Sequence, residues 1–297
     1  MYDQAEKLRQ LVQNSRGPGV QPPTGAGAQN STRVITITSG KGGVGKTNFT
    51  VNLAVALARM GQKILVIDAD LGAANVDVVL GCTSSYSLIN ILDDNLPIAD
   101  VIADGPEGIR YLSGGSGIQR LANLDEMQLA KIIDKIALFD NWADIILIDT
   151  GAGVSRNVIN FVLAADEVIL ITTPEPTAMT DAYAMLKTYG SHQGNALLKL
   201  VVNRVTEIDE GEMVKARLIH AADRFLRLSV APLGVIYEDG NLVKAVKKQQ
   251  PVLLAYPGTS SSRCIQHIAG QLIHHQAPAS PQGIKGFFNK VMGFWKR

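Results

Sequence analysis

Glycines, two lysines and a threonine share one short stretch of the chain, which reads Gly40-Lys41-Gly42-Gly43-Val44-Gly45-Lys46-Thr47. The stretch fits the pattern G-x-x-x-x-G-K-[ST], in which backbone N–H groups surround the phosphates of a nucleotide. Glycines permit the tight turn, and the N-terminus of the following helix contributes positive partial charge. In this pattern Lys46 reaches the β- and γ-phosphates, while the hydroxyl of Thr47 binds Mg²⁺. The stretch therefore predicts a site for a nucleoside triphosphate and Mg²⁺.

The segments on either side of this loop support the prediction. Residues 33–38 are rich in β-branched and apolar residues, which is typical of a buried strand. Residues 46–60 have the pattern of a helix and end at Gly61, a residue type that commonly terminates helices. Strand, glycine loop and helix in this order are the context in which the motif binds phosphate. A glycine-rich turn without a ligand is therefore the weaker interpretation.

Short apolar runs recur along the chain and alternate with helical segments. Four runs, at 64–67, 145–148, 168–171 and 200–202, are typical of parallel strands buried on both faces. We expect strands at 33–38, 63–68, 109–113, 144–149, 167–172, 198–203 and 230–236, and helices near 46–60, 124–139, 155–164, 177–190, 209–227 and 240–248. This alternation predicts an α/β fold with a doubly wound, mostly parallel sheet and helices on both faces.

Polar residues and glycines follow three of the expected strands. The first group is Asp68, Asp70, Gly72 and Asn75, the second is Asp149, Gly151 and Gly153, and the third is Asn203 and Arg204. The carboxyl ends of parallel strands gather at one edge of a sheet, so these groups should meet the phosphate loop there. The first two groups would form switch loops that move with the γ-phosphate.

Three aspartates in these loops have the chemistry that phosphoryl transfer requires. Asp149 and Asp68 would face Mg²⁺ together with Thr47, because carboxylate and hydroxyl oxygens suit this hard cation. Asp70 lies two residues beyond Asp68 and is placed to orient the attacking water. The alternative is that Asp68 and Asp70 only cap the following segment.

The overall composition suits one large domain with a buried core. Of 297 residues, 46% are hydrophobic and 19% are charged, and the formal net charge is +1. So small a net charge gives no general attraction to nucleic acid, and we expect no direct binding to DNA. Two distant cysteines, Cys82 and Cys264, favour a reducing cytoplasm over a disulfide framework. No secretory signal and no membrane-spanning run is expected.

Composition divides the chain into five parts. Residues 1–14 have the pattern of a short helix, and residues 15–32, rich in glycine, proline, glutamine and serine, predict a flexible linker. The α/β domain is expected at 33–275. A second linker at 276–282 and a helix at 283–297 follow it.

The last of these parts combines one apolar stripe with basic residues. Its apolar residues are spaced at i, i+3, i+4, i+7, i+8 and i+11, namely Ile284, Phe287, Phe288, Val291, Met292 and Trp295. It has no acidic residue, and Lys285 and Lys290 are among its basic ones. Such a helix either docks on its own domain or lies in an anionic lipid surface. The aromatic side chains and the basic polar face favour the membrane, and the docked form would hold the helix when ATP is absent.

The extra lysine of the phosphate loop, Lys41, resembles the deviant Walker A motif of the MinD/ParA ATPases, and the resemblance covers roughly residues 33–275. It implies a MinD-like P-loop NTPase fold, bound ATP and Mg²⁺, and an ATP-dependent homodimer in which Lys41 reaches the phosphates of the other subunit. Lys41, Lys46 and Asp70 would then be catalytic, and hydrolysis would be slow and dependent on dimerisation.

The same resemblance implies where the base binds. By analogy with the family, the residues that contact or enclose the base are Asn203, Arg204, Pro232 and Glu238. One departure is the segment Asp149-Thr150-Gly151-Ala152-Gly153, which replaces the Ser-Pro-Ala-Gly form common in MinD itself. That departure favours a homologue of MinD over MinD itself.

The N-terminal residues Asp3-Gln4-Ala5-Glu6-Lys7-Leu8-Arg9 resemble the D-Q-A-x-x-L-R motif of the flagellar MinD homologues called FlhG, FleN or YlxH. The resemblance implies that this helix stimulates the GTPase FlhF through Asp3, Gln4, Ala5, Leu8 and Arg9. It implies a regulator of flagellar number and placement that also meets flagellar C-ring components, with a flagellar transcription activator as a further candidate partner. A terminal helix without function is the alternative.

Together these patterns predict a cytoplasmic ATPase that attaches to the inner membrane when ATP is bound. Dimerisation would join two weak membrane helices into one stronger attachment. The main alternative is a ParA-type ATPase that positions DNA on the nucleoid, which requires a basic stripe. The basic residues are scattered, and Lys244, Lys247 and Lys248 form only a modest cluster.

Overall fold

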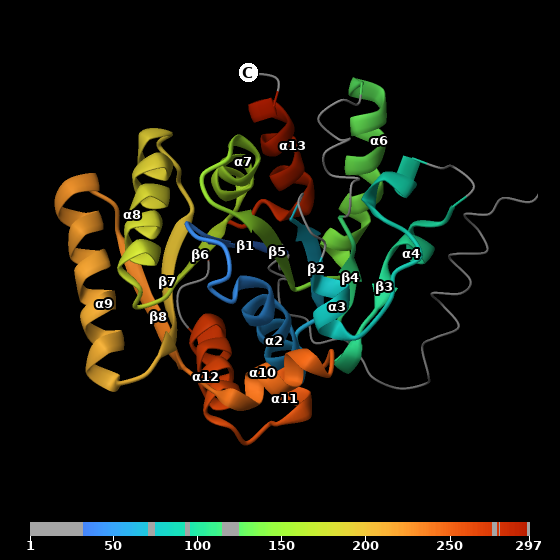
Figure 1. Ribbon diagram of the computed structural model, residues 1–297. Helices are drawn as coiled ribbons and strands as arrows, with labels where there is room; N and C mark the ends of the chain where they lie inside the picture. The colour runs from blue at the N-terminus through green and yellow to red at the C-terminus, as the bar shows by residue number, and fades with distance from the viewer. Residues whose placement is uncertain are drawn as a thin grey trace, which may run out of the picture. The chain divides into compact units, whose positions relative to one another are not determined.

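The centre of the computed structural model is a sheet whose strands run in the order β3-β4-β2-β5-β1-β6-β7-β8 (Figure 1). The structure describes residues 32–70, 75–92, 96–114, 125–274, 278 and 280–295. In this part of the chain the strands are β1 Arg33–Ser39, β2 Ile64–Ala69, β3 Ala103–Asp104, β4 Arg110–Leu112, β5 Ile145–Ala152, β6 Glu167–Thr172, β7 Leu197–Val205 and β8 Val230–Tyr237. All pairs are parallel except β3 with β4.

Helices cover both faces of the sheet. One face carries α6 Glu126–Ile136, η3 Ala137–Asn141, α7 Arg156–Ala164, α8 Pro176–Ser191, α9 Ile208–Ala221, the π-helical turn η4 Ala222–Leu226 and α13 Gly283–Trp295. The other carries α2 Lys46–Arg59, α3 Val76–Leu80, α10 Gly240–Lys247, α11 Val252–Ala255 and α12 Ser260–His274. Shorter pieces are η1 Leu88–Leu92, α4 Ile98–Val101 and η2 Pro106–Gly108. Each face has its own apolar core.

The central strands form because their apolar runs can be buried on both sides at once. Every residue of β2 and β6 is buried, as are the first six of β5. In the register between β2 and β5, Asp68 lies opposite Asp149. The sheet therefore places two aspartates side by side at the edge where the phosphate loop leaves β1.

The predicted α/β class and the predicted central strands are confirmed. The structure adds the two-residue strand β3, which is too short to give a pattern, and the helix α12, which the sequence analysis did not assign. The apolar residues of α12 that are buried, Ile265, Ile268, Ala269 and Leu272, do recur at helical spacing. The expected helix at 209–227 is divided into α9 and η4, and that at 124–139 into α6 and η3.

The C-terminal helix α13 is docked on the domain. Five of the six stripe residues are buried, and Trp295 is half-buried. The helix packs against α7, α6, η3 and β1, so α13 belongs to the same compact unit as the α/β domain, past the boundary expected at 275. None of the helices in the described ranges has both the length and the apolar character needed to span a bilayer. The predicted helix at 1–14 and the motif at 3–9 lie outside the described residues.

Candidate nucleotide-binding site

The loop between β1 and α2 has a backbone that glycine alone fits well. Gly43 and Gly45 have φ angles of 77° and 93°, in the left-handed region that side chains disfavour. A Cβ at Gly40 would lie 2.1 Å from the carbonyl oxygen of Asp181, and a Cβ at Gly45 would lie 2.4 Å from Nδ2 of Asn203. That amide nitrogen donates a hydrogen bond to the carbonyl of Val44 at 2.7 Å. The loop is therefore held closely between β7 and α8, with Gly45 at the N-terminus of α2.

Lys46 and Asp149 form the buried polar centre beneath this loop. The Lys46 ammonium lies 3.4 Å from Oδ1 of Asp149, and the side chains of the two residues are 7% and 1% exposed. Asp149 also accepts hydrogen bonds from the hydroxyls of Thr47 at 2.6 Å and Thr50 at 2.9 Å. Burial raises the pKa of Asp149, and the nearby Lys46 ammonium counteracts that rise.

Asp68 adds a second negative charge beside this centre. Burial, and secondarily the charge of Asp149, raise the pKa of Asp68 from 3.8 to about 6. The Asp68 carboxylate also accepts backbone N–H bonds from Asp70 at 3.1 Å, Asn75 at 2.9 Å and Val76 at 3.1 Å. Asp68 thus organises the turn into α3, as the capping interpretation expected, while lying in register with Asp149.

The residues at this edge fit Mg²⁺. Two adjacent buried carboxylates with raised pKa values carry an excess of negative charge, and carboxylate and hydroxyl oxygens are ligands that Mg²⁺ accepts. Thr47 and Asp149 would hold the ion, with Asp68 beside them. A bound Mg²⁺ would neutralise charge on the nucleotide phosphates.

The two predicted switch loops meet at Asp70 and Gly151. A Cβ on Gly151 would lie 3.4 Å from Oδ1 of Asp70, so the half-buried Asp70 side chain rests against the second loop. Gly153, with φ 85°, donates its N–H to the carbonyl of Ser39 at 2.9 Å and so ties this segment to the end of β1, directly before the phosphate loop. Gly72, also predicted in the switch, lies outside the described residues.

Lys41 is turned away from the buried centre. Its ammonium contacts Oε2 of Glu175 at 2.7 Å and the hydroxyl of Thr177 at 2.8 Å, where α8 begins. The hydrogen bond from Lys41 lowers the pKa of Glu175. The sequence analysis missed Glu175 and Thr177, although they follow β6 at the same edge of the sheet. Applying the strand-end rule to β6 would have found them.

A pocket of about 310 Å³ adjoins the phosphate loop and brings together Asn203, Arg204 and Glu238, three of the four predicted base contacts. Gly45, Phe49 and Leu242 are among its other walls. The size and the mixture of apolar and polar walls suit a nucleotide base.

Asp239 also lines this pocket and anchors the two helices beside it. Its carboxylate accepts hydrogen bonds from the backbone N–H of Asn241 at 2.9 Å, and from Ser261 through its N–H at 3.1 Å and its hydroxyl at 2.8 Å. Burial favours a higher pKa for Asp239, but these hydrogen bonds outweigh it and lower the pKa to about 2. One carboxylate thereby fixes the starts of α10 and α12.

Pro232 is not part of this pocket, and its assignment to the base was wrong. It pairs with Leu200 near the start of β8 and lines a different cavity with Tyr189, Lys199 and Arg227. The physical reason is the direction in which β8 runs. β8 runs parallel to its neighbour, so only its final residues reach the edge where the phosphate loop lies.

Comparison with known proteins agrees with this geometry. Residues 35–252 match the family described as CobQ/CobB/MinD/ParA nucleotide binding domain. The chain belongs to this family. Among its MinD/ParA members, antiactivator FleN of Pseudomonas aeruginosa is 38% identical over 262 residues, which are 88% of this chain and 94% of FleN. The flagellum site-determining protein YlxH of Helicobacter pylori is 31% identical over 99% of both chains.

A solved MinD structure has the same fold. MinD of Pyrococcus horikoshii, in complex with Mg-ADP, is 29% identical and superposes with a TM-score of 0.66 over 82% of this chain and 96% of that one. The resemblance to the FlhG, FleN and YlxH branch of the MinD/ParA family is therefore confirmed, and so is the assignment of a MinD-like P-loop ATPase. The roles of individual site residues stay predictions.

Proposed function

We propose that this chain is an ATP-driven switch that dimerises with ATP, attaches to the cytoplasmic face of the inner membrane, and regulates flagellar number and placement. The observation that carries the proposal is the pairing of two features in one domain. A buried Lys46–Asp149 centre lies under a phosphate loop, and a basic, aromatic helix is docked on the same unit.

The chemistry follows from the positions of the side chains. Lys46 stabilises charge on the β- and γ-phosphates, and Thr47 and Asp149 hold Mg²⁺. Asp70, resting against Gly151, orients the attacking water. Lys41 must first leave Glu175 and then stabilise the γ-phosphate of the other subunit, which makes hydrolysis slow in the monomer and dependent on dimerisation.

Membrane attachment requires α13 to leave the surface formed by α6, α7, η3 and β1, which we call the α13 groove. In the docked form the apolar residues Phe287, Phe288 and Val291 face the domain and are closed to lipid. Release would present them to the bilayer, and Lys285 would exchange its contact with Asp134 for anionic headgroups. Two released helices in one dimer bind through effective concentration, which links ATP to attachment.

The flagellar assignment rests on similarity to FleN and YlxH and on the motif at residues 3–9. Through that motif the chain would stimulate FlhF, and we include flagellar C-ring components among its partners. The name antiactivator, given to FleN, supports a flagellar transcription activator as a further partner.

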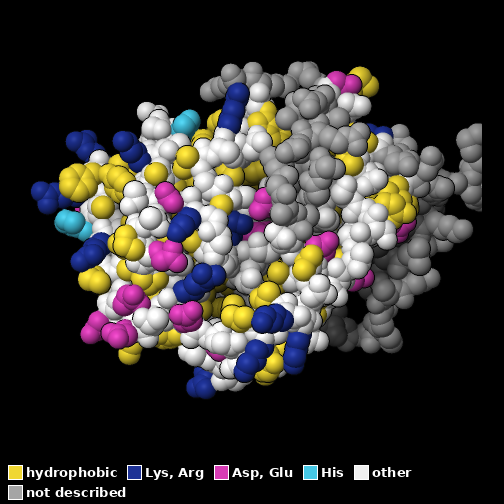
Figure 2. Space-filling view, viewed as in Figure 1, with side chains coloured by type: hydrophobic (Ala, Val, Ile, Leu, Met, Phe, Trp, Pro, Cys, Tyr) yellow, Lys and Arg dark blue, Asp and Glu magenta, His cyan; other side chains and the backbone are white. Residues whose placement is uncertain are grey.

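Surface charge favours this function over a nucleoid ATPase. Basic and acidic side chains are interspersed on the face drawn in Figure 2, with a small group of basic ones at the lower edge, where α10 lies in Figure 1. Lys244, Lys247 and Lys248 of this region are exposed but lie beside the exposed residues Val243 and Val246. A stripe that tracks a DNA backbone would be broader and more purely basic.

The decisive experiment is co-sedimentation with liposomes that contain anionic lipid, in ADP and in ATP. Full-length protein, a chain ending at Gln282 and the double variant Phe287→Glu, Trp295→Glu are compared. We expect ATP-dependent binding by the full-length protein alone. Asp70→Ala, which should bind ATP without hydrolysing it, should remain on the liposomes.

The controls separate the membrane from the flagellar partner. Deleting residues 2–14 should leave liposome binding intact and remove any stimulation of FlhF GTPase activity. Absence of ATP-dependent liposome binding by the full-length protein would contradict the membrane switch, and binding to DNA instead would favour the ParA-type alternative.

A further inference from the structure

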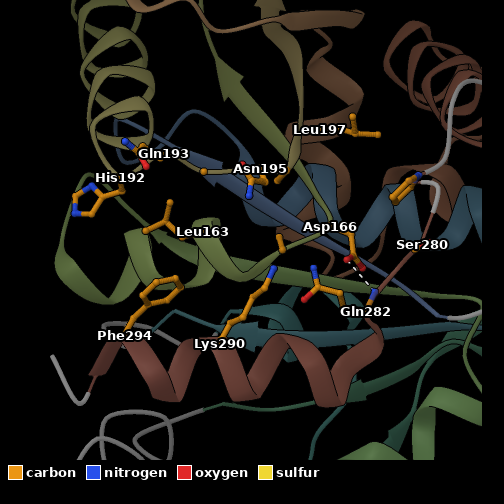
Figure 3. A pocket seen from close by; sticks show the side chains of 14 residues that line it. Leu163, Asp166, His192, Gln193, Asn195, Leu197, Ser280, Gln282, Lys290 and Phe294 are labelled. Atoms are coloured by element: carbon orange, nitrogen blue, oxygen red, sulfur yellow. Dashed lines mark hydrogen bonds between the residues drawn. The ribbon is translucent and has the colours of Figure 1, made fainter.

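The two ends of α13 are held by different parts of the domain. At its start, the Asp140 carboxylate accepts the backbone N–H bonds of Ile284 at 2.6 Å and Lys285 at 3.2 Å. The preceding Gln282 donates its N–H to Asp166 at 3.1 Å, drawn as a dashed line in Figure 3. Asp140 lies in η3, and Asp166 lies between α7 and β6. None of these contacts involves a loop of the nucleotide site.

The other end of α13 is held by α7. Arg156, the first residue of α7, donates from Nη2 to the carbonyl of Phe294 at 3.2 Å. When the oxygen and nitrogen of the Asn160 side-chain amide are exchanged, the oxygen accepts a hydrogen bond from the indole N–H of Trp295 at 3.0 Å and the nitrogen donates one to the Arg156 carbonyl at 3.3 Å. Phe161 meets the Trp295 ring edge-on, with centroids 6.2 Å apart. The polar contacts described at this end therefore come from one helix.

One flank of the same end is incompletely packed. A cavity of about 380 Å³ lies between α13 and the 192–197 segment, lined by Lys290 and Phe294 from one side and His192 and Asn195 from the other (Figure 3). Figure 3 shows the Lys290 side chain reaching from α13 toward Asp166. α7 packs against both halves of α13, since Phe161 also stacks on Phe287 with ring centroids 6.0 Å apart. In the described residues, the polar contacts that α7 makes with α13 are at the second half, to Phe294 and Trp295.

The start of α7 is also the end of the nucleotide loop. β5 carries Asp149 and meets Asp70 at Gly151, near its own end. Gly153 then donates its N–H to Ser39, the last residue of β1 before the phosphate loop. Ser155 then caps α7 by accepting the N–H of Val158 at 3.5 Å. Only Val154 and Ser155 separate the glycine tied to the end of β1 from the arginine that holds α13.

We propose that α7 couples the nucleotide to α13, with Arg156 and Asn160 as positioning residues. Movement of residues 150–155, the end of β5 and the turn into α7, toward a bound γ-phosphate shifts the N-terminus of α7 and withdraws these two side chains from Phe294 and Trp295. The helix then leaves from its C-terminal end and remains hinged at Asp140. This link rests on the proposed ATP switch and specifies how the bound nucleotide affects the docking of α13.

The link makes a quantitative statement about undocking. We define the undocking constant as the ratio of released to docked α13 at equilibrium. If the α7 contacts exist with ADP and are lost with ATP, a variant without them has a higher undocking constant in ADP and an unchanged one in ATP. The ratio of the two constants then falls. A contact that only helps docking would raise both constants equally, and the ratio would stay the same.

Trp295 itself reports the position of α13. In a full-length Trp142→Phe background it is the only tryptophan of the sequence, so its emission wavelength and acrylamide quenching give the undocked fraction. The measurement is made without lipid, in Mg-ADP and in a Mg-bound non-hydrolysable ATP analogue. The test variant is Arg156→Met, and Arg156→Lys should restore part of its effect. The matched control is Lys285→Met, which breaks the contact with Asp134 at the hinged end.

We expect Arg156→Met to lower the ATP-to-ADP ratio of undocking constants by about threefold to tenfold, the range for one exchanged hydrogen bond. Lys285→Met should leave the ratio unchanged. An unchanged ratio in Arg156→Met, or an equal fall in both variants, would overturn the link while leaving the switch in place. If the parent protein undocks equally in both nucleotides, the release step of the proposed function fails, and the link fails with it.

Discussion

The nucleotide site and the surface on which α13 docks differ in what remains to be satisfied. At the nucleotide site, the adjacent carboxylates Asp68 and Asp149 are buried with raised pKa values, and Lys46 is their principal cation. In the groove, apolar side chains such as Ile284, Phe287 and Val291 are almost fully buried. One site has excess charge that an external ligand can relieve, and the other is filled by a segment of the same chain.

This difference shows how one domain can have two equilibria, nucleotide binding and α13 docking, that respond to different physical forces. A charged ligand acts strongly at the first site because burial magnifies electrostatic interactions there. The groove responds instead to shape and apolar area, and a second apolar surface can compete for the helix. Without bound nucleotide, a substitution at one site should therefore leave the intrinsic property of the other intact.

The largest effect should come from Lys46→Met. The variant loses two charge-assisted contacts to phosphate, so affinity for ATP should fall on the order of a thousandfold. Titration with a fluorescent ATP analogue measures this loss, and Trp295 quenching without nucleotide should be unchanged. Lys41→Met is the matched control and should bind ATP nearly as well as the parent monomer. Normal affinity in Lys46→Met would contradict the assignment of the centre.

Asp68 should give the protein a pH-dependent stability that originates at the nucleotide site. Its pKa is about 6, against a usual 3.8, so the folded protein retains a proton there that the unfolded chain has lost. As pH rises from about 4 to about 6, this group loses a relative stabilisation of up to about 3 kcal/mol. Asp68→Asn should therefore gain stability relative to the parent over that range, and the difference should level off above it. Urea unfolding without nucleotide tests this, and parallel pH profiles would refute it.

Gly283→Ala tests the hinge of the groove. Gly283 has φ 67°, and an added Cβ would lie 2.5 Å from Oδ1 of Asp140. The strain should raise the undocked fraction of α13 about tenfold. Gly293→Ala is the matched control, because open space surrounds that position and alanine favours the helix. Trp295 quenching in both variants gives the comparison, and equal docking would show that Asp140 is not a hinge.

The smallest effect should follow Glu175→Gln. The Lys41–Glu175 pair is exposed, and such pairs contribute little. Freeing Lys41 should strengthen ATP-dependent dimerisation by at most about threefold, and salt should remove even that gain. Analytical ultracentrifugation at two salt concentrations measures it. A large change would mean that the pair holds the monomer more firmly than an exposed contact can.

The contrast between the nucleotide site and the α13 groove also separates what could be predicted from the sequence from what could not. The apolar runs predicted the central strands. The rule that parallel strands end at one edge placed Asp68 beside Asp149 and Asn203 against the phosphate loop, which is where the structure has them, while their roles stay predictions. Pro232 was misplaced because it was assigned by analogy without counting its position along β8. The caps of α13 depend on Asp140 and Asp166, more than a hundred positions away along the chain, and no local pattern reveals them.

The orientation of α13 shows a more general limit. Its stripe of Phe287, Phe288 and Val291 has the same spacing whether the neighbour is lipid or the domain, because both surroundings are apolar. Only the matching surface on α6, α7 and η3 distinguishes the two, and that surface is assembled from distant segments. Sequence periodicity therefore predicts that a face is buried before it predicts what buries it.

The double role of Asp239 has a consequence for how this protein can vary. Its neighbour Glu238 is exposed and lines the pocket that we predict holds the base, and its side chain makes no hydrogen bond to a helix in the described residues, so replacements there should alter that pocket at little structural cost. A replacement at Asp239 would loosen the starts of two helices at once. Two adjacent positions should therefore differ in the substitutions that they tolerate. Glu238 should accept changes that alter the pocket, and Asp239 should not.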